Sequence, residues 1–151
     1  MARVFPLATV RLLARERAEA AAREFGGHAR RLAAARGKLL QLEAFRAQYR
    51  SQRDAMLVAG VGAARLRDLD AFLARLEEAA RTQAEEAARL DAIFEAARAR
   101  WLELRRREQA MDVLAARHTE IETERARRLD QKAQDEYSQR ISQAPLRVRL
   151  R

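Results

Sequence analysis

The chain has 151 residues and carries 31 Lys and Arg against 22 Asp and Glu, for a formal net charge of +9 at pH 7. Five glycines and two prolines are too few for the turns of an all-β fold or a many-element globule, and the absence of cysteine excludes disulfides and thiolate metal sites. Alanine, arginine, glutamate, leucine and glutamine dominate, which is typical of long helices and coiled coils.

Two helices are expected, over about 7–58 and about 64–141, joined by a turn at about 59–63 and followed by a frayed tail at 142–151. Pro6 suits a helix start, where its missing N–H costs nothing. Gly60 and Gly62 mark the break, and no Gly or Pro follows until Pro145. The predicted fold is therefore all-α, a single coiled-coil hairpin over 1–151 with a C-terminal helical overhang.

Hydrophobic periodicity supports both helices. In the second helix, steps of three and four residues select twelve positions, eleven of them apolar: Leu66, Leu69, Leu73, Leu76, Ala80, Gln83, Ala87, Leu90, Phe94, Ala97, Trp101 and Leu104. The matching frame in the first helix is looser, with four polar members: Leu7, Arg11, Ala14, Ala18, Ala21, Phe25, His28, Leu32, Ala35, Leu39, Leu42, Arg46, Tyr49, Arg53 and Met56. A short connection favours antiparallel neighbours, so the two stripes should face each other.

The two helices differ in length. A turn near residue 61 places Leu7 opposite about Leu114, so the second helix should continue alone for about 26 residues, or roughly 40 Å at ~1.5 Å per residue. An isolated helix is marginal in water. The overhang should be mobile in the free protein or held by a partner.

Enzymatic signatures are missing from the sequence: it has no phosphate-binding GxxxxGK[ST], no GxGxxG, no GxSxG and no HExxH. The two histidines, His28 and His118, cannot supply paired zinc ligands and are expected to be half-exposed stripe residues. We expect no catalytic site, no metal and no cofactor.

Eight residues near the turn repeat one spacing on both helices. Each of the four on the first helix has a partner on the second such that the two residue numbers add up to the same total: 38 with 83, 42 with 79, 45 with 76 and 49 with 72. We call them the turn-proximal patch: Lys38, Leu42, Phe45, Tyr49, Phe72, Leu76, Ala79 and Gln83. One interpretation is core and flank of the coiled coil. The other is a docking surface, because Phe45 and Phe72 fall at g positions of the heptad, where charge is usual.

A series of basic residues lies along the first helix, and Glu43 is the only acidic residue beside it. It consists of Arg30, Arg31, Arg36, Lys38, Arg46, Arg50 and Arg53. A solvated face explains it most simply. Nucleic-acid binding is not expected, because interleaved exposed aromatics and a recognition module are absent.

Near the end of the second helix the sequence resembles the flagellar export protein FliJ family. The resemblance rests on Arg128-Leu129-Asp130-Gln131-Lys132, Asp135-Glu136 and Arg140. The rest of the chain agrees with it around Phe5-Pro6-Leu7, from Leu42 to Arg50, at Gly60, and around Phe72, Leu73, Leu76 and Glu77.

The resemblance implies a soluble, cytoplasmic, monomeric component of the bacterial flagellar type III export apparatus, similar to the stalk of rotary ATPases. It implies binding to the hexameric export ATPase, to the cytoplasmic domain of the export-gate membrane protein and to export chaperones. The family's gate-contact positions fall on the turn-proximal patch, with Lys38 and Gln83 where Gln and His are expected and Phe45 where Tyr is usual. The ATPase-contacting end comprises the paired termini and the overhang, and its contact residues fall on what we call the C-terminal motif: Arg128, Leu129, Asp130, Gln131, Lys132, Asp135 and Glu136.

Two alternatives remain at this stage. The equivalent stalk protein of a virulence-type injectisome shares the architecture and kinds of partner. A generic dimeric coiled-coil scaffold would instead have twice the mass of one chain in solution.

Overall fold

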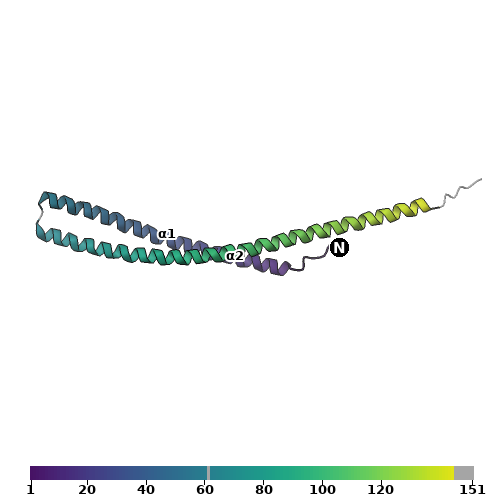
Figure 1. Cartoon of the computed structure of the whole chain (residues 1–151), viewed down its shortest axis with the longest axis horizontal. Coiled ribbons are helices and arrows are strands. Elements are labelled where there is room, and N and C mark those ends of the chain that lie inside the picture. The colour runs from purple at the N-terminus through teal and green to yellow at the C-terminus, as the bar shows by residue number, and fades with distance from the viewer. Residues whose placement is uncertain (61, 145–151) are drawn as a thin grey trace, which may run out of the picture. The chain divides into compact units, whose positions relative to one another are not determined.

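The computed structural model describes residues 1–60 and 62–144, and its regular structure consists of two helices (Figure 1). Helix α1 spans Ala8–Ala59 and helix α2 spans Ala63–Gln143. They pack against each other, which confirms the predicted all-α hairpin. Most of the tail predicted for 142–151 lies outside the described residues.

Local interactions place the helix ends. The carbonyl of Phe5 accepts the N–H of Ala8 at 3.1 Å, and that of Leu7 accepts the N–H of Arg11 at 2.8 Å. At the other end of α1, Gly60 has a φ of 73°. Only glycine adopts this left-handed conformation without cost, so Gly60 ends α1 where the sequence predicted the break.

The chain forms two compact units. Unit 1 contains Met1–Glu16 and α2 from Arg105 onward, and unit 2 is Arg17–Leu104. Both helices pass through both units.

Unit 2 is held together by the two predicted stripes. All twelve stripe positions of α2 are buried or half-buried, and Leu73, Ala80 and Ala87 are buried. Leu32 and Ala35 of α1 are also buried. Small residues bring the helices close, whereas Phe25 fills a wider section by stacking on Phe94 and Trp101, with ring centroids 5.0 and 5.3 Å away.

In unit 1 the N-terminal segment packs beside α2. Arg11 binds Asp112 at 2.7 Å, and the ring of Phe5 meets His118 edge-on at 5.5 Å. The N–H of Arg3 donates to Glu122 Oε2 at 3.2 Å. The segment before α1 is not helical, so each of its residues reaches about 3.3 Å rather than ~1.5 Å along α2.

The overhang is therefore shorter than expected. Pairing continues to Glu122 instead of ending near Leu114, and every residue from Thr123 to Ala144 is exposed. We call residues 123–144 the overhang from here on.

In the part of the chain that the structure describes, neither helix contains an apolar stretch long enough to cross a membrane.

Candidate functional site: partner-binding surfaces

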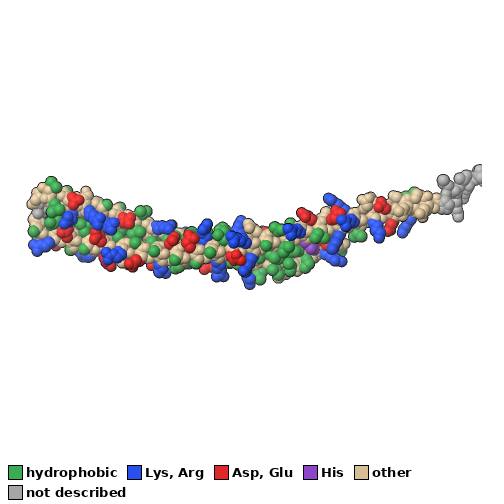
Figure 2. Space-filling model, viewed as in Figure 1, with side chains coloured by type: hydrophobic (Ala, Val, Ile, Leu, Met, Phe, Trp, Pro, Cys, Tyr) green, Lys and Arg blue, Asp and Glu red, His purple; other side chains and the backbone are tan. Residues whose placement is uncertain are grey.

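Ion pairs between the helices lie along one flank of unit 2. Arg36 binds Asp91 at 3.0 Å, and Arg50 and Arg53 pair with Glu77 and Asp70. In each pair α1 supplies the arginine and α2 the carboxylate. On the face displayed in Figure 2, blue and red side chains accordingly lie beside one another over the paired helices. We call this the ion-paired flank.

These contacts correct one expectation. The basic run of α1 is not unopposed, because Arg36, Arg50 and Arg53 find acids on α2 that are 17 to 55 residues away in sequence. The hydrogen bond to Asp70, together with its negative charge, raises the pKa of Arg53 above its ordinary value. The interpretation as a solvated face holds for Arg30 and Lys38, which are exposed and have no ion pair within residues 1–60 and 62–144, whereas Arg46 is half-buried at its stripe position.

The opposite flank of unit 2 carries the outer half of the turn-proximal patch, and we call it the open flank. Lys38, Phe45, Phe72 and Ala79 occupy the g positions, whereas Leu42, Tyr49, Leu76 and Gln83 belong to the stripes. Lys38, Phe45 and Ala79 are exposed, and Phe45 keeps 51% of its surface in solvent. The four stripe members and Phe72 are half-buried.

An aromatic contact joins the two helices within this patch. The rings of Tyr49 and Phe72 meet edge-on with centroids 4.7 Å apart, which is the pairing expected from their numbers. Half of the patch thus belongs to the seam, as the first interpretation predicted, and the docking surface stays a prediction. Its stripe residues hold the helices together, while Phe45 presents an aromatic ring to solvent beside them.

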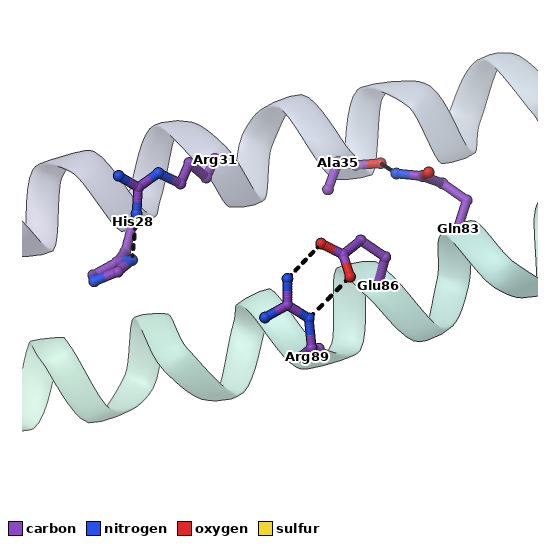
Figure 3. A network of polar contacts seen from close by, with 6 residues as sticks. All are labelled: His28, Arg31, Ala35, Gln83, Glu86 and Arg89. Carbon is purple, nitrogen blue, oxygen red and sulfur yellow. Dashed lines mark hydrogen bonds and ion pairs between the residues drawn. The ribbon is translucent and has the colours of Figure 1, made fainter.

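Gln83, the polar stripe member of α2, points across to α1. Its side-chain N–H donates to the backbone carbonyl of Ala35 at 3.0 Å (Figure 3). This amide is thus used between the helices rather than at the polar edge of the patch. A polar group in a coiled-coil seam favours one register, because a shifted register would leave it buried without a partner.

A second polar contact of this region lies within α2. The guanidinium of Arg89 donates to both carboxylate oxygens of Glu86 within α2, at 2.7 and 2.9 Å (Figure 3). This contact lowers the pKa of Glu86. Both carboxylate oxygens of Glu86 are therefore engaged within α2 and not across the hairpin.

The C-terminal motif lies on the overhang, and all seven of its residues are exposed. Arg128 binds Glu124 one turn earlier at 2.9 Å, and Leu129 exposes 67% of its surface. Leu129 begins a row in which every fourth residue is apolar. The row continues through Ala133, Tyr137 and Ile141, and the last two expose 68% and 58%.

Tyr137 and Ile141 were not among the residues expected to bind a partner. The signal was present in the sequence, because residues four apart lie on one face of a helix. Their separation by charged and amide residues concealed it. Together the four form an exposed apolar ridge, whose first member, Leu129, lines a pocket with the N-terminal residues Met1, Ala2 and Arg3.

Within the described residues no group of three His, Asp or Glu side chains could hold a metal ion. His28 and His118 lie half-buried in the stripes, as expected.

A family model described as "Flagellar FliJ protein" matches residues 3–147, nearly the whole chain. No curated protein and no solved structure matches the chain significantly.

Proposed function

Because this chain belongs to the flagellar FliJ protein family, and is thus a component of the flagellar export apparatus, we propose that it is a non-catalytic adaptor there. It binds the export gate through unit 2 and the export ATPase through the overhang of unit 1, and it escorts empty export chaperones. It acts as a monomer in the cytoplasm, associated with the membrane only through its partners.

The gate contact is supported by one observation above all. Phe45 exposes half of its ring on the open flank, next to Leu42, Tyr49 and Phe72, whereas the other flank carries the ion pairs. A half-exposed aromatic beside a half-buried apolar cluster has the anatomy of a binding hot spot. Because the patch already belongs to a packed helix pair, docking there orders few additional residues.

The ATPase contact is proposed for the overhang, since its residues 123–144, the apolar ridge included, are all exposed. The ridge from Leu129 to Ile141 would bury against the ring, and the charged residues of the C-terminal motif would orient it. An exposed helix gains most of its stability from such packing.

Phe45→Ala tests the gate contact, with Leu40→Ala as its control. Leu40 is 66% exposed on the same helix but faces away from the turn-proximal patch. Loss of a hot-spot aromatic costs about 2 kcal/mol, so Phe45→Ala should weaken binding to the cytoplasmic domain of the gate protein about 30-fold. Leu40→Ala should change it less than twofold, and both variants should keep the helicity of the parent chain.

Equal weakening by both variants would refute the patch, as would unchanged affinity in Phe45→Ala. Co-purification with an injectisome ATPase in place of the flagellar one would favour the virulence-type stalk. A solution mass of two chains by light scattering would favour the dimeric scaffold.

A further inference from the structure

Residues 1–5 come before α1 and pack on α2 without being helical, and we call them the strap. The ring of Phe5 meets His118 with centroids 5.5 Å apart. The N–H of Arg3 donates to Glu122 Oε2 at 3.2 Å. The strap thus has two defined attachment points on α2, which lie one helical turn apart.

The strap takes the place of α1 where the facing stripe of α2 becomes polar. Steps of three and four residues carry that stripe from the buried Ala115 to His118, Glu122 and Arg125. Arg125 donates to Oε1 of Glu122 at 2.9 Å, and the Glu122 side chain is only 12% exposed. An apolar helix packed at this level would leave the other carboxylate oxygen without a donor, whereas the strap supplies the N–H of Arg3.

Little apolar surface holds the strap in place. Met1 is fully exposed and Val4 is 83% exposed, so neither buries its side chain on α2. The first three strap residues line a hollow of about 440 Å³ whose other walls are Glu122, Arg125, Ala126 and Leu129. A segment with few buried apolar contacts opens locally at a low cost in free energy. The strap can therefore leave α2 while the two helices stay paired.

The hollow connects the strap with the proposed ATPase contact. Leu129 lines the hollow, and it is also the first member of the apolar ridge and part of the C-terminal motif. A partner that covers Leu129 from the side of the seam has to enter the space beside Met1 and Ala2. The closed strap and a bound partner therefore compete for this part of α2.

We propose that the strap is an autoinhibitory element, which limits access to the start of the apolar ridge when closed and is released when the ATPase binds. The inference rests on the proposed ATPase contact and adds its regulation. A chain that is mostly closed binds with an apparent affinity reduced by its open fraction. Opening the strap should therefore strengthen binding, and locking it should weaken binding.

A covalent lock tests the competition on the full chain. Because the sequence contains no cysteine, Ala2→Cys combined with Ala126→Cys creates a single reactive pair across the hollow. A short bismaleimide joins the two positions. The joined chain should bind the purified export ATPase about fivefold or more weakly in surface plasmon resonance. The control is the same variant with each cysteine capped by N-ethylmaleimide, which carries similar added groups but leaves the strap free.

The opposite change removes an attachment point. Phe5→Ala takes away the ring contact with His118 and should strengthen ATPase binding about threefold or more. In the free chain it should also speed the hydrogen exchange of the Arg3 amide. Val4→Ala is the matched control, because Val4 is 83% exposed, and it should leave both measurements unchanged. Circular dichroism checks that each variant keeps its helices.

Three outcomes would overturn the inference. One is equal affinity of the joined and capped chains, and another is weaker or unchanged binding in Phe5→Ala. The third is an Arg3 amide that exchanges equally fast in the parent chain and in Phe5→Ala, since the strap would then already be open. Absence of ATPase binding in every form would instead refute the ATPase contact itself, and with it this inference, whereas the first three outcomes leave that contact standing.

Discussion

Two stretches of the same helix behave differently although their local sequences favour helix equally. From Leu66 to Leu104, α2 buries a stripe against α1, whereas from Thr123 to Gln143 every residue of α2 is exposed. Neither stretch contains Gly or Pro. In the overhang, helix propensity and short-range ion pairs such as Arg128 with Glu124 act alone. Helix formation and helix pairing are thus separate consequences of this sequence, and only pairing requires an uninterrupted apolar stripe with a facing helix.

The largest expected effect comes from placing proline in each stretch. Ala87 is buried in the seam of unit 2, and Ala87→Pro should cost ~3 kcal/mol or more because it removes a helix hydrogen bond and displaces packed side chains. Ala133→Pro should lower helicity at 222 nm but leave the urea midpoint of the chain unchanged, because Ala133 and its neighbours in the overhang are exposed. A similar fall in the midpoint for both variants would show that the overhang unfolds together with the paired helices.

A leucine pair on α1 tests the seam more finely. Leu32 exposes 3% of its surface and Leu40 exposes 66%. Leu32→Ala should destabilise the chain by about 2–4 kcal/mol, since it removes buried methyl groups and leaves a cavity. Leu40→Ala should stay within about 0.5 kcal/mol. Urea unfolding followed by circular dichroism measures both, and equal values would contradict the assignment of the stripe.

The smallest effect is expected at Glu122, where pairing ends and the overhang begins. The N–H of Arg3 donates to its carboxylate and, with Arg125 and His118 nearby, lowers the pKa of Glu122 below its ordinary value of 4.5. A lowered folded-state pKa means that this contact is fully present above about pH 4.5 and is lost as the pH falls through the folded value. The amide proton shift of Arg3 in NMR spectra should therefore titrate in that acidic range.

Glu122→Gln should abolish this titration, because the amide side chain carries no charge to lose. Glu124→Gln is the control, since Glu124 binds Arg128 and does not contact Arg3. A titration of the Arg3 amide that persists in Glu122→Gln would assign the N-terminal attachment to another group.

Much of the site could be located from sequence spacing. Alternating steps of three and four residues identified the α2 stripe. The constant total of the residue numbers paired across the turn matched Tyr49 with Phe72, whose rings are in contact. The role of Gln83 could not be foreseen, because a glutamine at a stripe position is equally compatible with an exposed edge and with the inward hydrogen bond to Ala35. The partners of Arg36 and Arg50 were also missed, since they come from the other helix.

The sequence by itself determined the two helices, their break at Gly60 and the stripes through which they pair, because these features depend on interactions between residues at most a few positions apart. Only the tertiary structure decided which flank carries the ion pairs, which flank leaves Phe45 exposed, and how far the N-terminal segment covers α2. The physical reason is that these features depend on the side of the seam on which each residue flanking the stripe lies. They also depend on the extended reach of the residues before α1, which helical spacing does not describe.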